Sequence, residues 1–213
     1  MTTAAAMTYD SLVTDIVTYA NRSDADFANQ VPRFIMLCEN KLARGVRNLG
    51  YLKYATGNFP VANPTFAKPS RWRQTVSFNY TDPTGKRTFI YPRSYDFCRS
   101  YWPDPSKTDL PAYYADYDYE HYFIVPTPAL GYALEISYHE RPEPLSTAQQ
   151  TSWTTQYAPQ LLLYGCMVEA MTYLKNTEKV QLWKGLCDEE MKGLAGEEAE
   201  RAGDDRATQR VQA

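Results

Sequence analysis

The hydrophobic pattern of this chain changes its period between residues 112–145 and residues 157–176. The first segment reads AYYADYDYEHYFIVPTPALGYALEISYHERPEPL, in which aromatic and polar residues alternate between proline-containing turns, as is typical of strands. The second reads YAPQLLLYGCMVEAMTYLKN, with apolar residues at helical spacing behind a proline that suits a helix start. The chain must therefore combine a sheet with helices.

The N-terminal part of the chain has helical periodicity. Residues 9–20 carry one apolar stripe behind Thr8, which suits an N-cap. A longer helix is predicted from Val31 to a stop at Gly50, with one apolar row and a charged remainder. Two helices therefore precede the strand-like region.

The C-terminal part is also helical, up to a polar tail. Helices are predicted from Trp153 to a break at residues 176–177, and again over residues 177–194. Residues 195–213 contain almost no large apolar side chains, so they cannot bury enough surface to offset the entropy lost on ordering. We expect them to form a flexible tail.

The middle of the chain is predicted to be rich in strands. An extended connection is expected over residues 51–70, followed by strands and one short helix at residues 95–102. The predicted strands cover residues 71–80, 86–91, 113–117, 122–125 and 133–140. Their connections are too short for crossover helices, so the sheet should be antiparallel.

These elements predict an α+β fold. N- and C-terminal helices (8–50 and 153–194) form a helical bundle, and residues 51–152 form an inserted antiparallel β-rich domain. Residues 195–213 form the flexible C-terminal tail. A chain of 213 residues is long enough for one large or two small domains, at roughly 100–200 residues per domain.

Composition excludes several classes of function. The net charge of −3 argues against a dedicated nucleic-acid binder, which usually has a strong basic excess. None of the four cysteines lies in a CxxC or CxxH pair, which argues against a zinc site. The N-terminus has neither the basic nor the apolar region of a signal peptide, and no run approaches the roughly 20 apolar residues of a membrane span.

The sequence offers few candidate catalytic groups. Its two histidines, His121 and His139, fall inside predicted strands, and no common catalytic or nucleotide-binding motif occurs. Asp116, Asp118 and Glu120 form the densest carboxylate cluster, which is either the polar part of a turn or a site for a divalent cation. We expect no enzyme activity, no cofactor and no metal.

Two pairs of basic residues lie on opposite arms of one predicted hairpin. They are Arg71 with Arg73, and Lys86 with Arg87. One interpretation is a solvated face, and the other is a patch that faces DNA or an acidic partner.

Tyrosine is the compositional outlier, with 18 residues. The tyrosines of residues 113–122 and the nearby Trp102 are candidates for a protein interface, because Tyr and Trp supply large, stiff, half-polar contact surfaces. The candidate interface residues are Tyr113, Tyr114, Tyr117, Tyr119 and Trp102. A sheet with one solvated face would also use tyrosine, so both interpretations stay open.

The order and spacing of several segments resemble the head-to-tail adaptor proteins of short-tailed bacteriophages, also called head-tail connectors or tail tubular protein A. The resemblance runs from about Thr8 to about Arg201. The segments that carry it are YDSLVTDIVTYANRSDADFANQVPRFIMLCENKLARGVR, IYPRSYDFCRSYW, YYADYDYEHYFIVPTP, YHERPEPLS and YAPQLLLYGCMVEAMTYLKN.

This resemblance implies a structural protein of the virion neck. Such adaptors are bundles with a small β-domain, and they form a twelve-subunit ring under the portal that continues the DNA channel and docks the tail nozzle or tube. It also implies that the tail, with Arg201, Arg206 and Arg210, orders on the portal protein. Assembly in the host cytoplasm is expected.

Two other functions compete with this one. A carbohydrate- or receptor-binding module could stack sugar rings on the exposed tyrosines and on Trp102 and Trp153, although the terminal helices argue against such a β-module. A small hydrolase would have only the carboxylate cluster at residues 116–120 to support it.

Overall fold

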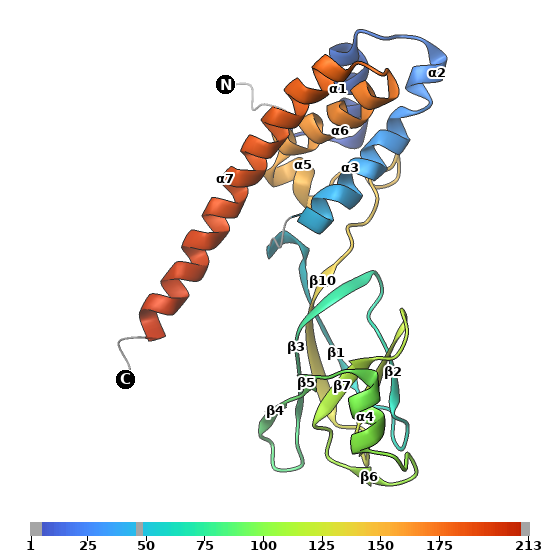
Figure 1. Cartoon of the computed structure of the whole chain (residues 1–213), viewed down its shortest axis with the longest axis vertical. Coiled ribbons are helices and arrows are strands. Elements are labelled where there is room, and N and C mark those ends of the chain that lie inside the picture. The colour runs from blue at the N-terminus through green and yellow to red at the C-terminus, as the bar shows by residue number, and fades with distance from the viewer. Residues whose placement is uncertain (1–5, 46–48, 210–213) are drawn as a thin grey trace. The chain divides into compact units, whose positions relative to one another are not determined.

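The structure, a computed structural model, describes residues 6–45 and 49–209, except for the side chains at 49, 198 and 201–209. The chain forms two compact units (Figure 1): residues 1–51 with 142–213 make a helical unit, and residues 52–141 make a β unit. The predicted α+β fold, helices at both ends and an inserted antiparallel β-rich part, is confirmed. The β unit ends at Arg141, whereas the predicted insertion ended at residue 152.

The helical unit is built around α6. Its elements are α1 (Tyr9–Ala20), α2 (Ala25–Ala28), α3 (Val31–Gly45), the 3-10 helix η1 (Leu49–Tyr51), α5 (Trp153–Tyr157), α6 (Pro159–Tyr173) and α7 (Thr177–Gln209). The local signals explain the bounds of α1: Thr8 and Ser11 cap its first turn reciprocally, and Asn21 ends it in the left-handed conformation. Apolar residues of α1, α3 and α6 form one continuous core with a stripe of α7.

Two predicted helix ends in this unit are wrong. The described part of α3 runs to Gly45, and Leu49–Tyr51 is a 3-10 helix, so α3 ends before the expected stop at Gly50. Helix α7 continues to Gln209, beyond the expected end at Leu194, because residues 195–209 are mostly good helix formers with no proline. Of the α7 side chains that the structure describes, Leu194 is the last that packs on the core. Within the described residues no helix is long and apolar enough to cross a membrane.

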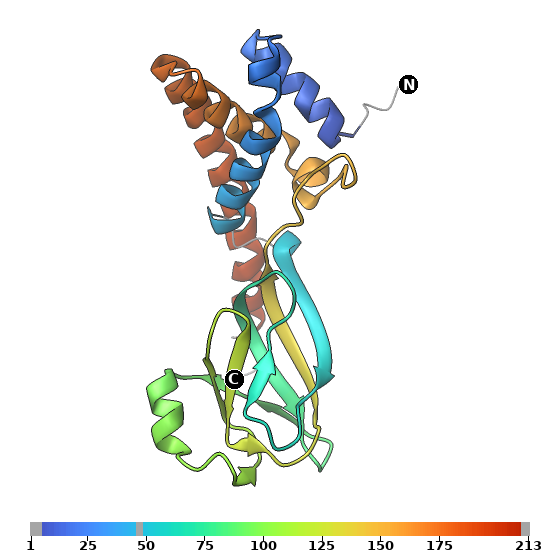
Figure 2. The ribbon, with the colours of Figure 1, turned by 90° about the vertical axis from the view of Figure 1, so that its right-hand side faces the viewer.

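The β unit contains two four-stranded sheets and one two-stranded sheet (Figure 2). Its elements are β1 (Leu52–Asn58), β2 (Thr65–Ala67), β3 (Trp72–Thr81), β4 (Arg87–Phe89), β5 (Tyr91–Pro92), α4 (Tyr95–Tyr101), β6 (Thr108–Asp109), β7 (Tyr113–Asp116), β8 (His121–Val125), β9 (Thr127–Pro128) and β10 (Ala133–Glu140). The strand orders are β1-β10-β3-β4, β2-β8-β7-β5 and β6-β9.

Pairing in these sheets is antiparallel except for β5 with β7 and β6 with β9, which are short parallel pairs. The extended connection predicted over residues 51–70 contains two paired strands that the sequence did not predict, β1 and β2. Strand β1 pairs along its whole length with β10, so its partner lies far away in the sequence.

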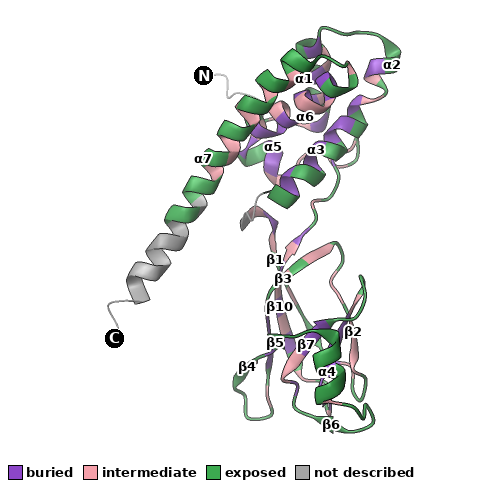
Figure 3. Cartoon of the chain, viewed as in Figure 1, coloured by how far each residue is buried: buried purple, intermediate pink, exposed green. Residues whose placement is uncertain are grey.

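An aromatic core lies inside the β unit. Phe78 stacks on Phe59 and contacts Tyr122, with ring centroids 5.8 and 5.4 Å apart respectively, and Ile136 is fully buried beside them. Figure 3 shows such buried residues inside the units and exposed residues along α4 and α7. The alternation predicted for β10 is observed, since every second residue of it is buried.

Candidate assembly surfaces

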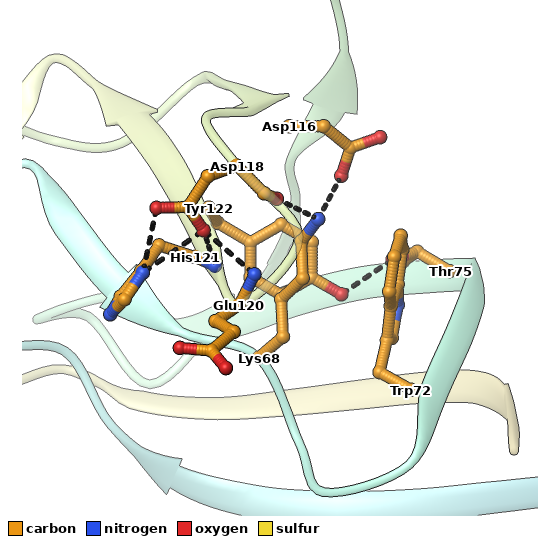
Figure 4. Close-up of polar contacts among 8 residues, drawn as sticks. All are labelled: Lys68, Trp72, Thr75, Asp116, Asp118, Glu120, His121 and Tyr122. Atoms are coloured by element: carbon orange, nitrogen blue, oxygen red, sulfur yellow. Dashed lines mark hydrogen bonds and ion pairs between the residues drawn. The ribbon is translucent and has the colours of Figure 1, made fainter.

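The turn between β7 and β8 is braced by the Asp118 carboxylate (Figure 4). Asp118 Oδ1 accepts hydrogen bonds from the backbone N–H groups of Glu120 and His121, at 2.7 and 2.6 Å, and the carboxylate lies 3.0 Å from His121 Nδ1. Desolvation raises the pKa of Asp118, but the hydrogen bonds from Glu120 and His121 outweigh it, so the pKa is lowered overall. Asp118 therefore shapes the turn, as an aspartate in an Asx-turn does.

Lys68 holds the base of the same turn. Its Nζ lies 2.8 Å from Asp116 Oδ1, donates to the Asp118 backbone carbonyl at 2.8 Å, and lies 3.8 Å from the Trp72 ring centroid (Figure 4). Only 3% of the Lys68 side chain is exposed. The Tyr122 ring centroid lies 5.2 Å from the same Lys68 Nζ. The Tyr122 hydroxyl lies 2.6 Å from Thr75 Oγ1. A buried cation with ion-pair, carbonyl and ring contacts is fully compensated.

The carboxylate cluster is therefore a structural turn and not a convergent site. Asp116 is bound by Lys68, Asp118 is bound by the turn, and Glu120 is exposed. Over the described ranges, no three His, Cys, Asp or Glu residues are arranged to hold a metal ion. Sequence reasoning missed Lys68, because a lysine in an unpatterned connection carries no signal of burial.

The predicted interface residues separate into surface and core. Tyr117 and Tyr119 are 51% and 59% exposed, and Tyr113 and Trp102 are half-buried. Tyr114 is only 8% exposed and packs on Phe78 with ring centroids 5.3 Å apart. The expectation that Tyr114 presents its ring for contact is wrong, because successive residues of a strand point to opposite faces and Tyr114 points to the core.

Helix α4 enlarges the aromatic surface beyond the predicted set. The rings of Tyr95, Phe97, Tyr101, Tyr113 and Tyr117 form what we call the α4 face. Phe97 and Tyr101 stack at 5.8 Å, and each meets the Tyr113 ring edge-on, at 5.4 and 5.2 Å. Tyr95 packs on Tyr117 at 5.6 Å. The signal in the sequence was the i, i+4 spacing of Phe97 and Tyr101 in the predicted helix.

The four candidate basic residues do not form one patch. Arg71 Nη2 lies 2.7 Å from Glu140, and Arg87 pairs with Glu135. In the β3–β4 pair, Arg87 lies opposite Thr81, at the far end of β3. Thr81 is eight residues after Arg73, a separation of about 26 Å along a strand. The hairpin arms are unequal in length, so the two pairs of basic residues lie apart, and of the two interpretations the solvated face fits this arrangement better.

Three further candidates lie outside the described part of the chain. Residue 210 is not described, and of residues 201 and 206 only the helical backbone is. The suggested docking role of Arg201, Arg206 and Arg210 therefore stays a prediction.

The exposed aromatic rings of the α4 face suit a protein that acts through contacts with other proteins. The family model of the SU10 adaptor protein matches residues 7–212. The chain belongs to the SU10 adaptor protein family. The family match confirms the resemblance to phage head-tail adaptors. A comparison with curated proteins found no match to the chain.

Membership in this family gives the adaptor a structural role in a bacteriophage. It implies a component of the virion neck that interacts with portal and tail proteins. For such a role the exposed surfaces of the adaptor matter more than any pocket.

Proposed function

We propose that this adaptor forms a ring of twelve identical subunits that joins the portal to the tail nozzle or tube and continues the DNA channel. The observation that carries the proposal is the α4 face together with the family match over residues 7–212. Aromatic clusters that are exposed in the single chain are typical of surfaces that become the buried centre of a protein interface on assembly. In a ring, each subunit repeats the contact, so a modest pairwise affinity suffices.

We also propose that the C-terminal segment binds the portal. Among the α7 residues whose side chains the structure describes, Leu194 is the last that packs on the core of the helical unit, which leaves the polar residues after it as candidates for a partner. This segment is the end of α7 up to Gln209, and in a ring every subunit would present the same helix to the portal, so a weak contact per subunit suffices.

Double-stranded DNA would pass through such a ring without sequence-specific binding. The net charge of −3 and the ion pairs of Arg71 and Arg87 with carboxylates support weak interaction with phosphates. A role for Arg73 and Lys86 at the channel stays a prediction.

Electron microscopy of the purified chain, alone and mixed with the portal protein of its phage, tests the proposal. Rings of twelvefold symmetry stacked on the portal are expected. Monomers that ignore the portal but bind to a glycan array would contradict the proposal and support the sugar-binding alternative.

A further inference from the structure

Two arginines lie against the aromatic rings around α4. The guanidinium carbon of Arg93 is 5.5 Å from the ring centroids of both Phe97 and Tyr113, and that of Arg99 is 5.9 Å from the Phe123 centroid. Stacking on a ring orients a guanidinium and leaves N–H donors at its edge for a carboxylate. The face therefore presents oriented cationic donors between aromatic rings.

Neither guanidinium has a carboxylate partner within the part of the chain that the structure describes. Arg22, Arg71 and Arg87, in contrast, each pair with a carboxylate of their own unit. Tyrosine and arginine are the residues most enriched at interface positions that cost affinity when truncated. The α4 face thus combines hot-spot residue types with two guanidinium groups that form no ion pair within the described residues.

A cleft opens next to Arg93. It lies between the start of β3 and the strands β5 and β7 and has a volume of about 210 Å³. Its charged wall residues are Arg73, Arg93 and Asp116, whose carboxylate is paired with Lys68. Pockets for small-molecule ligands usually span roughly 300–1,000 Å³, so this cleft is better suited to one inserted side chain. The Arg93 guanidinium forms no ion pair among the described residues, and a carboxylate is the chemical group that it favours.

A protein partner explains this face better than DNA does. Binding to the DNA backbone relies on a longer track of protruding basic residues, whereas here two stacked guanidinium groups lie among rings. In addition, each subunit of a ring with one rotation axis contacts its two neighbours through two different patches of its surface. A positive patch on the chain therefore calls for a negative patch on the same chain.

Helix α7 carries such a patch. Asp188 and Glu189 are exposed, and among the described residues they form no ion pair. They begin a stretch, residues 188–200, with six acidic residues and one basic residue. We propose that the α4 face and its cleft bind the carboxylates of Asp188 and Glu189 from a second copy of this chain. This inference rests on the proposed ring.

Sedimentation velocity of the full chain over a concentration series tests this pairing. One variant reverses the charge of the two arginines (Arg93→Glu with Arg99→Glu). A second variant reverses the charge of the two acidic residues (Asp188→Arg with Glu189→Arg). A third carries all four changes. The control reverses the charge of two exposed basic residues elsewhere, Arg33→Glu with Lys179→Glu. Thermal melts followed by circular dichroism verify that every variant is folded.

Each of the first two variants should weaken self-association about tenfold or more, because like charges then face one another. The fourfold variant should recover most of the affinity, and the control should match the wild type. Unchanged association of the arginine variant, or a fourfold variant that stays weak, would overturn the pairing. So would an arginine variant that loses DNA binding in a gel-shift assay while it still self-associates.

The failure of this pairing is distinguishable from failure of the proposed ring. If wild type and all variants form rings on the portal, the ring stands and the pairing is wrong. If the wild-type chain forms no ring, alone or on the portal, the proposed function itself is wrong.

Discussion

The Glu39 carboxylate on α3 accepts a 3.0 Å hydrogen bond from the backbone N–H of Leu145, which lies 106 residues later in the chain. Glu39 is only 3% exposed, and its second carboxylate oxygen, Oε1, has no hydrogen-bond partner. Burial raises the pKa of Glu39 to about 7, although the hydrogen bond from Leu145 lowers it in part. A segment that follows the β unit is therefore attached to α3 through a titratable group.

Stability of the helical unit should fall as the pH rises through this pKa. The ordinary carboxyl pKa is 4.5 and the folded value is about 7, so the folded state binds the proton more tightly. The resulting stabilisation is complete below pH 4.5 and is lost as the pH approaches and passes 7, on the order of 2–3 kcal/mol in all. Urea unfolding at pH 5 and pH 8 measures it.

Glu39→Gln should remove most of this pH dependence, because the amide cannot ionise but can still accept the Leu145 hydrogen bond. The control is Glu189→Gln, an exposed position on α7, which should keep the wild-type slope. Equal slopes in the wild type and in Glu39→Gln would contradict the prediction.

Gly165 should not tolerate alanine. A Cβ at this position would lie 2.4 Å from Cys38 Sγ, so Gly165→Ala should destabilise the chain by about 1–3 kcal/mol through overpacking. Gly185→Ala on α7 is the matched control: nothing lies within 4 Å of its Cβ, so it should stabilise by about 0.5–1 kcal/mol. Adding Cys38→Ala to Gly165→Ala should restore part of the loss, and no recovery would show that Cys38 is not the obstacle.

Tyr114 and Tyr117 should respond differently to truncation. Tyr114→Ala removes a buried ring that packs on Phe78 and Tyr122, and should cost about 3–5 kcal/mol of unfolding free energy. Tyr117→Ala should change stability by less than about 1 kcal/mol but weaken assembly on the portal. Thermal melts and co-sedimentation with portal separate the two effects, and normal assembly by Tyr117→Ala would exclude its ring from the interface.

Asp116→Asn should destabilise the β unit by about 1–2 kcal/mol. The change leaves the buried Lys68 ammonium without its carboxylate, although the Asp118 carbonyl still accepts from it. Glu120→Gln, an exposed neighbour in the same turn, should have almost no effect on urea unfolding. If Asp116→Asn instead abolished a hydrolytic activity of the pure protein, the structural interpretation of this turn would be wrong.

Truncation after Leu194 should leave a folded chain that no longer attaches to DNA-filled heads. Among the described side chains of α7, Leu194 is the last that packs on the core, so the melting temperature should stay close to that of the full chain. Pull-down with portal protein is the measurement. Portal binding as tight as that of the full chain would place the docking surface on the helical unit instead.

Local sequence patterns determined the elements whose signals lie within a few residues. The capped apolar stripe predicted a helix at residues 9–20, and the structure has α1 at Tyr9–Ala20. The alternation at residues 133–140 likewise predicted β10 with the observed bounds. Periodicity and capping act on the backbone of neighbouring residues, so they can be recognised without knowledge of the fold.

Only the tertiary structure decided which residues are partners and which are exposed. Strand β1 has no pattern of its own and is a strand because it pairs with β10, and Lys68 is buried because β7, β8 and Trp72 enclose it. Tyr114 and Tyr117 look alike in sequence, yet one is in the core and the other on the surface. Burial and pairing depend on contacts between segments far apart in the chain, and no local pattern specifies those contacts.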